Sequence, residues 1–429
     1  MTTSVPDDTR RKTNRYLVVF ICFAAIVFDG YDLIIYGSTV PSLLAYKEWA
    51  LTPAEVGALG SYALLGMMFG ALASGPLTDR FGRRKMLLGC LILYSTMMLL
   101  AAAAPNPPTL GVIRFIAGLG FGGVAPVAIA LVVEVARPHE RQRLNAIMLA
   151  GLPVGGVLAA LAALTFLDDV GFRGLWAFGG VALVTVVPLA WRYIPETAPA
   201  ARDKTSKTDE SPMRQLTNGR AITALVLFAV ANFAGFLLVF GLNTWLPQLM
   251  RAANYDLTSA LAFQVLLNLG AVVGGVSGSA LADRIGARRV APATFLVATI
   301  AIAVMASAPP AGVMAVATLA AGLGSIGTQM IVFGYVATYF ETSVRGTALG
   351  VTTGIGRLGA VTGPAIGGIL LSSGLGNAWV FGFFCAIAIL GGVACVIVPA
   401  GPPRRSNPPS PHMRSTTETE PATRQGERG

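Results

Sequence analysis

Charged side chains are scarce in this sequence. Asp, Glu, Lys and Arg together supply 12% of its 429 residues, whereas hydrophobic residues supply 54%. Soluble globular domains usually carry about 25% charged residues, so this chain has too few charges to cover a water-exposed surface of its size. We therefore expect a lipid bilayer to be its solvent.

Histidine and cysteine are also rare, with two and four residues. His139 falls in an expected loop and His412 in the C-terminal tail, while all four cysteines lie inside apolar runs without metal-ligand spacing. The sequence contains no convincing nucleophile–base pair and no phosphate-binding loop. It therefore predicts a protein that is not an enzyme and that needs neither a metal nor another cofactor.

Long apolar stretches define the fold class. A helix needs about 20 residues to cross about 30 Å of hydrocarbon, and twelve stretches are long enough. We predict an all-α integral membrane protein with twelve transmembrane helices. The predicted spans are 16–44, 56–78, 86–104, 109–135, 143–166, 173–194, 220–250, 258–281, 289–308, 311–338, 346–372 and 377–399.

The basic residues predict how these spans are oriented. Alternate connections hold 26 Lys and Arg residues on one side and only 3 on the other. Because basic residues mark the cytoplasmic side, both termini are expected in the cytoplasm and the protein in the cytoplasmic (inner) membrane. This distribution also explains the net charge of +10 without a nucleic-acid partner.

Polar segments divide the chain. Residues 195–219 are polar and charged, and this predicted flexible linker separates six spans from six. The expected organisation is an N-terminal tail (1–15), an N-terminal half (16–194), the linker (195–219), a C-terminal half (220–399) and a disordered tail (400–429). The basic residues before the first span resemble a signal peptide, but the apolar run is too long for one.

The two halves contain related segments. GPLTDRFGRRK (75–85) and SALADRIGARR (279–289) place Asp79 and Asp283 204 residues apart, and Glu134 and Glu341 stand 207 residues apart. Two six-helix halves in parallel repeat, with a site between them at mid-membrane, are typical of secondary transporters. We therefore predict two pseudo-symmetric halves.

These segments carry a resemblance to a known family. GPLTDRFGRRK resembles the signature between helices two and three of the major facilitator superfamily, and SALADRIGARR a degenerate second copy. LGVIR (110–114) and IPET (194–197) resemble its motifs in helix four and after helix six. The resemblance covers about 16–399, and it implies the major facilitator fold and transport by alternating access.

The resemblance also implies a latch that closes the cytoplasmic end and releases it during transport. Asp79 is expected to accept hydrogen bonds at a helix N-terminus and to pair with arginines of the opposite half. Gly75 would allow helices to approach, and Gly82 a tight turn. Ala287 stands where Arg83 stands in the first copy, so the second latch should be weaker; the alternative is that these charges only flank spans. The predicted gating residues are Gly75, Asp79, Arg80, Gly82, Arg83, Arg84, Glu134, Arg141, Asp283, Arg284, Glu341 and Arg345.

Four charged residues fall well inside predicted spans, away from the span ends, where their cost marks them as functional candidates. Asp29 and Asp32 share a helix face because they are three residues apart, and Arg357 is expected about 18 Å along its helix from the cytoplasmic side. A buried carboxyl group can take up and release a proton, and a guanidinium binds a carboxylate bidentately. We predict proton coupling at Asp29 and Asp32 and substrate binding at Arg357 and Arg114. The alternatives are ion pairs that only stiffen the bundle, or an Arg114 side chain that reaches toward the interface.

Neutral polar and aromatic residues complete the predicted substrate site. Amides at this depth can line a cavity or join helices, and aromatic rings can stack on a planar ligand or simply pack. The sequence does not separate these alternatives. The predicted residues are Tyr31, Tyr36, Gln264, Asn268, Gln329 and Tyr335, with Asn232, Asn243, Trp245 and Phe333 as further candidates.

The first span indicates a branch of the family. FDGYDLIIYG (28–37) resembles the first helix of the aromatic acid:proton symporters, and most closely that of benzoate transporters. The resemblance implies that Asp29 and Asp32 serve proton-coupled uptake and that Arg114 is the helix-four arginine. Val127 stands where many relatives that transport hydroxylated acids have Asn, which favours an unsubstituted ring.

The predicted function is symport of a proton with benzoate or a close aromatic acid. An external acid would meet Arg357, a proton would load on Asp29 or Asp32, and the halves would rock to release both inside. The alternatives are symport of another organic acid (hydroxybenzoate, muconate or a shikimate-like acid) and proton-driven drug export. The expected partners are the acid, the proton and the bilayer, and we expect a monomer.

Overall fold

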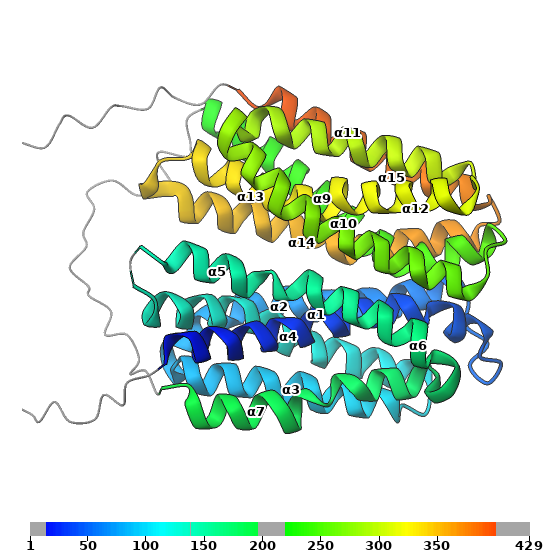
Figure 1. Cartoon of the computed structure of the whole chain (residues 1–429), viewed down its shortest axis with the longest axis horizontal. Coiled ribbons are helices and arrows are strands. Elements are labelled where there is room, and N and C mark those ends of the chain that lie inside the picture. The colour runs from blue at the N-terminus through cyan, green and yellow to red at the C-terminus, as the bar shows by residue number, and fades with distance from the viewer. Residues whose placement is uncertain (1–13, 138, 196–218, 400–429) are drawn as a thin grey trace, which may run out of the picture. The chain divides into compact units, whose positions relative to one another are not determined.

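The computed structural model describes residues 14–137, 139–195 and 219–399. Apart from residues at their edges, the predicted N-terminal tail, linker and C-terminal tail lie outside these ranges. The described residues are helical except for short connections, and they include no β-strand. The predicted all-α class is therefore confirmed (Figure 1).

The N-terminal half is built from seven helical segments that supply its six spans. They are α1 (Arg15–Ala45), α2 (Pro53–Phe81), α3 (Arg83–Ala102), α4 (Pro107–Val135), α5 (Arg141–Leu149), α6 (Gly151–Gly179) and α7 (Ala182–Tyr193). The backbone inside α6 is not helical at Gly171, where φ is 66° and ψ is 178°. A positive φ of this kind suits glycine, and it separates the part of α6 in the fifth span from the part in the sixth.

The C-terminal half contains the other six spans. They are formed by α9 (Gly219–Ala252), α10 (Leu257–Ile285), α11 (Ala287–Ala306), α12 (Ala311–Gly322), the π-helical η1 (Leu323–Gly327), α13 (Thr328–Tyr339), α14 (Thr342–Ser372) and α15 (Asn377–Ile397). Within the described ranges, eleven continuous helical stretches are long and apolar enough to cross a membrane. One of them, Arg143–Tyr193, has 51 residues and contains the break at Gly171. The break divides it into two spans, which accounts for the predicted twelve.

One end of the bundle is rich in arginine and is called the arginine-rich end below, and the other is called the opposite end. At the arginine-rich end, α2 meets α3, α4 meets α5, α10 meets α11 and α13 meets α14; the turns between α1 and α2 and between α9 and α10 lie at the opposite end. The arginine-rich end is on the left in Figure 1. The junction residues Gly82 and Gly286 have φ of 84° and 91°. They are 204 residues apart, the spacing of Asp79 and Asp283, so the sequence repeat is also a repeat of backbone conformation.

Three of the helices that begin at the opposite end carry side-chain caps. Thr52 and Glu55 form a capping box at α2, while Asn106 caps α4 and Asp256 caps α10. Each cap satisfies a backbone N–H that has no partner within its helix. These caps fix where the spans begin and therefore the depth of the charged residues they carry.

The halves contact each other along α2 and α14 toward the opposite end. Ser61 Oγ donates to Val361 O at 2.7 Å, and Ala54 N donates to Ser372 Oγ at 2.9 Å. Further along, Leu64 forms a small apolar cluster with Phe240 and Ala360. No hydrogen bond between two described residues joins the halves on the arginine-rich side of this cluster and the adjacent Arg357.

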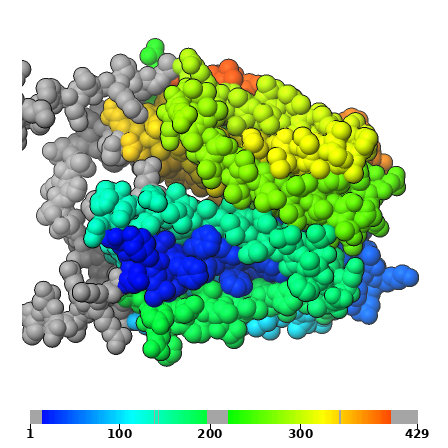
Figure 2. All heavy atoms as spheres, viewed as in Figure 1, coloured from blue at the N-terminus to red at the C-terminus, as the bar shows by residue number. Residues whose placement is uncertain are grey.

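The same two helices separate toward the arginine-rich end. A Cβ at Gly57 of α2 would lie 2.5 Å from Pro364 O of α14. Gly75 lies eleven residues, or about three helical turns, after Leu64 and therefore on the same face of α2. Gly346 lies eleven residues before Arg357 and on the same face of α14. A Cβ at Gly75 or Gly346 would have nothing within 4 Å. Figure 2 shows the surface between the halves hollowed toward this end, so the structure is closed at the opposite end and open at the arginine-rich end.

Candidate functional site

Two carboxyl groups are buried in the middle of α1. Asp29 and Asp32 are 3% and 2% exposed. Within the described ranges neither forms an ion pair, and Asp29 Oδ1 and both Asp32 oxygens have no hydrogen-bond partner. Because an unpaired buried carboxylate is costly, protonation at this pair changes the energy of the bundle.

Asp32 points into the N-terminal half. A Cβ at Gly179, the last residue of α6, would lie 2.1 Å from Asp32 Oδ1 and 3.2 Å from Cε of Met98 in α3. The carboxyl group is therefore enclosed between α1, α3 and the end of α6. It does not lie in the space between the halves.

Arg114 of α4 is the positive charge that interacts electrostatically with Asp32. It is 5% exposed, its Nε donates to Leu59 O at 3.1 Å, and its guanidinium carbon lies 3.9 Å from the centroid of the Tyr36 ring. Tyr36 donates to Val56 O at 2.6 Å. The predicted residues Arg114 and Tyr36 thus form one cation–π pair, and a backbone carbonyl of α2 holds each of them.

Arg357 of α14 is the positive charge that interacts electrostatically with Asp29. Its Nη1 donates to Met67 O of α2 at 3.1 Å, so a side chain from the C-terminal half reaches the N-terminal half. The guanidinium is half-buried and can offer its remaining donors to another acceptor. Arg357 therefore lies between the halves.

Aromatic rings and amides surround the α14 segment that carries Arg357. A Cβ at the adjacent Gly356 would lie 2.7 Å from Cδ2 of Phe236 and 3.0 Å from Cβ of Asn232. Phe236 stacks on Phe240 with 6.2 Å between centroids and lies 6.0 Å from Phe333. A guanidinium beside flat apolar rings suits a ligand that combines a carboxylate with an aromatic ring.

The predicted amides form two separate networks. Gln329 Nε2 donates to Asn232 Oδ1 at 2.6 Å, and this pair lies beside the rings described above. Gln264 accepts from Ser38 of α1 at 2.7 Å and donates to Asn243 O at 2.9 Å. Asn268 donates to Asn243 Oδ1 at 3.1 Å, so the second network joins the halves.

Two predicted substrate residues have other surroundings in this structure. The Tyr31 hydroxyl donates to Leu175 O at 2.9 Å, which ties α1 to α6. Tyr335 packs edge-on against Phe228 with 4.8 Å between centroids. Tyr335 also interacts electrostatically with Arg288, which lies near the arginine-rich end.

The predicted gating residues lie together at the arginine-rich end. Asp79 and Asp283 are exposed, and within the described part of the chain neither forms an ion pair or a side-chain hydrogen bond. Arg83 is ion-paired with Glu134, and Arg84 donates to Trp191 O. Those two contacts lie within the N-terminal half. The exposed members of the predicted set are Gly75, Asp79, Arg80, Glu134, Arg141, Asp283, Arg284 and Glu341, while Gly82 and Arg345 are less accessible.

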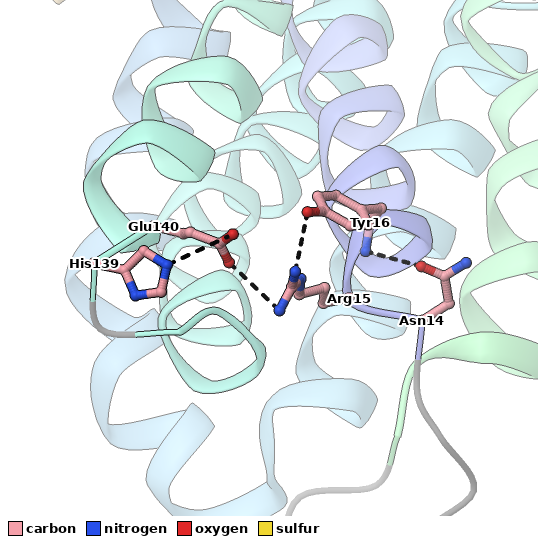
Figure 3. A network of polar contacts seen from close by, with 5 residues as sticks. All are labelled: Asn14, Arg15, Tyr16, His139 and Glu140. Atoms are coloured by element: carbon pink, nitrogen blue, oxygen red, sulfur yellow. Dashed lines mark hydrogen bonds and ion pairs between the residues drawn. The ribbon is translucent and has the colours of Figure 1, made fainter.

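A further contact at this end was not predicted from the sequence. Arg15 at the start of α1 lies 3.5 Å from Glu140 at the start of α5 and donates to the Tyr16 hydroxyl at 3.0 Å, while His139 lies 3.9 Å from Glu140 (Figure 3). Neither Arg15 nor Glu140 belongs to a repeated motif, and nothing in the sequence predicts that α1 and α5 meet. Phe236 was missed for a related reason, because an apolar residue in an apolar span has no distinguishing pattern.

Two six-helix halves in parallel repeat, with buried charged residues inside and between them, are the architecture of a secondary transporter. The sequence model of the Major Facilitator Superfamily matches residues 22–279 and 265–424. The chain belongs to this superfamily, which is a family of transporters and not of enzymes, as predicted.

Individual relatives agree with this assignment. The "Gentisate transporter" of Corynebacterium glutamicum is 37% identical over 90% of this chain and 87% of its own length. The "Benzoate transport protein" of Acinetobacter baylyi is 30% identical over 91% of each chain. These matches confirm the predicted resemblance to aromatic acid transporters. Among solved structures, a D-xylose–proton symporter matches with a TM-score of 0.77 at 16% identity, over 90% of this chain and 98% of that one, which supports the fold alone.

Proposed function

We propose that this protein is a proton-coupled symporter that imports a benzoate-type aromatic acid, with or without ring hydroxyl groups. The observation that carries the proposal is the position of Arg357, which lies between the halves and interacts with Asp29 and with Met67 O. The neighbouring Phe236 and Phe333 supply an apolar wall for a ring. The names of the gentisate and benzoate relatives support this substrate class.

In the proposed mechanism the acid and the proton act on the same pair of residues. The substrate carboxylate binds Arg357 bidentately, which competes with the interaction between Arg357 and Asp29. A proton on Asp29, which exchanges with Asp32 about one turn further along α1, removes the carboxylate that would otherwise be left unpaired. Binding of the acid and binding of the proton therefore favour each other, and this mutual dependence is the thermodynamic basis of coupling.

We assign the arginine-rich end to the cytoplasm, because basic residues gather on that side. The structure would then be the inward-open state. Asp79 and Asp283 would pair across the halves when that end closes, and the contacts of Ser61 and Ala54 with α14 would break when the outer end opens. This assignment also proposes the cytoplasmic membrane as the location and the sequence-predicted division into tails, halves and linker.

The test is accumulation of radiolabelled gentisate and benzoate in proteoliposomes with an imposed proton gradient. Uptake of either acid that requires the gradient and stops with a protonophore is the expected result. Asp29→Asn should remove the dependence on the gradient. Gradient-independent uptake of both acids would reject proton coupling, and transport of neither acid, by protein shown to be inserted and folded, would reject the substrate class.

A drug exporter is the less favoured function. Apolar or cationic compounds would meet a buried guanidinium at Arg357, which repels cations. Competition by unlabelled ring-free acids such as muconate would separate the remaining alternative of a non-aromatic organic acid. Strong competition by ring-free acids, together with none by benzoate, would favour it.

A further inference from the structure

Several buried polar atoms without partners lie inside the N-terminal half. Asp29 Oδ1, both oxygens of Asp32 and the Tyr94 hydroxyl are all buried, and none has a hydrogen-bond partner among the described residues. Buried polar atoms nearly always have partners, and ordered water supplies them where protein atoms do not. The clustering of unsatisfied atoms on α1 and α3 therefore points to one site and not to scattered defects.

The packing of α3 places Tyr94 on the helix face that carries Met98. Tyr94 and Met98 lie on one face of α3 because they are four residues apart, and Met98 lies against Gly179, which also abuts Asp32 Oδ1. The Tyr94 ring is 0% exposed and packs on Phe121 of α4 with 4.9 Å between centroids. Its hydroxyl interacts electrostatically with both Asp32 and Asp29.

The charged and titratable groups that act on Asp29 and Asp32 come from four helices. α1 supplies Asp29, Asp32 and Tyr31, α3 supplies Cys90, and α4 supplies Arg114, while Arg357 acts on Asp29 from the other half. Tyr31 is occupied by its bond to Leu175 O, and Arg114 by its bond to Leu59 O. The neighbouring Ser95 interacts with Tyr94, but neither hydroxyl has hydrogen-bond geometry with a described residue. The Tyr94 hydroxyl is therefore a buried donor for which no described carbonyl or carboxylate oxygen is the acceptor.

We propose that Tyr94 is a positioning residue of the proton site, whose hydroxyl donates to the Asp32 carboxylate through an enclosed water molecule. The inference rests on the proposed proton-coupled function and adds a residue to it. When Asp32 is ionised, the donated hydrogen bond stabilises the charge; when Asp32 takes up a proton, the hydroxyl and the carboxyl rearrange around the same water. Tyr94 therefore sets the pH at which Asp32 exchanges its proton, without contacting the aromatic acid.

The first experiment measures the proton directly in purified protein reconstituted in liposomes. The protonated-carboxyl stretch of Asp32 is assigned by its loss in Asp32→Asn and is titrated by infrared difference spectroscopy in wild type and in Tyr94→Phe. The expected result is loss of Asp32 protonation at a pH higher by about one unit in Tyr94→Phe, because a hydrogen bond to a charged group is removed. An unchanged titration would overturn the proposal whether or not the substrate is known.

The second experiment separates a positioning role from a structural one. Where wild type transports an aromatic acid, the pH of half-maximal uptake should rise by a similar amount in Tyr94→Phe, while exchange of labelled acid without a gradient stays within about twofold. Tyr62→Phe, which changes an exposed tyrosine of α2, is the matched control and should leave both unchanged. Equal loss of uptake and exchange would indicate damage to the fold and count against the proposal.

Failure of the variant to fold does not remove the test. 3-Fluorotyrosine introduced at position 94 alone keeps the side chain's size nearly unchanged and makes its hydroxyl a stronger donor. The Asp32 titration should then move to lower pH, opposite to the shift expected for Tyr94→Phe. A shift to higher pH, or none, would contradict the assigned donor.

Discussion

Gly179 and Asp32 touch: a Cβ on Gly179 would lie 2.1 Å from Asp32 Oδ1. Gly179→Ala must therefore displace the Asp32 carboxyl group or move the end of α6 away from α1. We expect gradient-driven uptake to fall by about tenfold or more, because a buried carboxyl group moved from its place has different neighbours and a different cost of ionisation. Uptake in proteoliposomes, normalised to inserted protein, measures the effect.

Gly89→Ala is the control for this prediction. Gly89 lies inside α3, and a Cβ there would have nothing within 4 Å. Alanine in a helix interior is favoured over glycine by about 0.5–1 kcal/mol, so the variant should transport normally and melt no lower than wild type. Equal activity of Gly179→Ala and Gly89→Ala would show that the contact between Gly179 and Asp32 has no role in transport.

The architecture could be predicted from sequence because it depends on simple, repeated signals. Apolar stretches of about 20 residues define the spans. The spacing of Asp79 and Asp283 indicated the repeat, and the positive φ of Gly82 and Gly286 confirms it in the backbone. The break at Gly171 was anticipated only as a short gap between two predicted spans. Its positive φ could not be assigned, because glycine is common throughout the predicted helices.

The candidate site could be predicted only in part. Rarity of charge in the spans identified Asp29, Asp32, Arg114 and Arg357, but spacing along one helix gives no information about neighbours on another. The structure pairs Asp32 with Arg114 inside one half, and Asp29 with Arg357, which reaches it from the other half. Tyr94 was missed because a tyrosine in an apolar span is ordinary until its hydroxyl is seen to lack a partner.

Arg357→Lys tests whether charge alone is sufficient between the halves. Lysine keeps the positive charge but loses the planar fork that can hold a carboxylate bidentately while also donating to Met67 O. We expect uptake to fall by about 10-fold to 100-fold, equivalent to losing one charge-assisted hydrogen bond. The loss should appear as a raised KM for the acid in initial-rate measurements. A KM within about twofold of wild type would exclude a guanidinium-specific contact with the substrate.

Asp256 offers a pH-dependent effect on stability away from the site. Hydrogen bonds from the Ser259 hydroxyl and backbone N–H lower the pKa of this exposed N-cap carboxyl group below its ordinary value. The carboxylate therefore stabilises the fold above the pKa it has in the unfolded chain, and this contribution is lost as pH falls through the lower folded pKa. Asp256→Asn keeps an acceptor but not the charge. Its melting temperature in detergent should be slightly below that of wild type at neutral pH, and the difference should vanish in acid; a difference that grows in acid would contradict the cap.

Gly57 and Gly75 lie on the same helix, and we predict opposite effects of their substitution on the conformational equilibrium. A Cβ at Gly57 meets Pro364 O at 2.5 Å, whereas one at Gly75 meets nothing within 4 Å in this state. Gly57→Ala should therefore disfavour closure of the opposite end, while Gly75→Val should leave the present state intact and hinder closure of the arginine-rich end. Both variants should transport more slowly, because alternating access needs both closures.

Accessibility of a cysteine reporter distinguishes the two variants. Ser61→Cys places a thiol in the contact with Val361 that closes the opposite end. A membrane-impermeant maleimide applied from that side should label it faster than in the parent when Gly57→Ala is added, and more slowly when Gly75→Val is added, because the two changes shift the population in opposite directions. Protein without Ser61→Cys gives the background from native cysteines. Similar labelling in both variants would mean that these glycines do not control which end is closed, and the separation of α2 from α14 would then have to be attributed to other contacts.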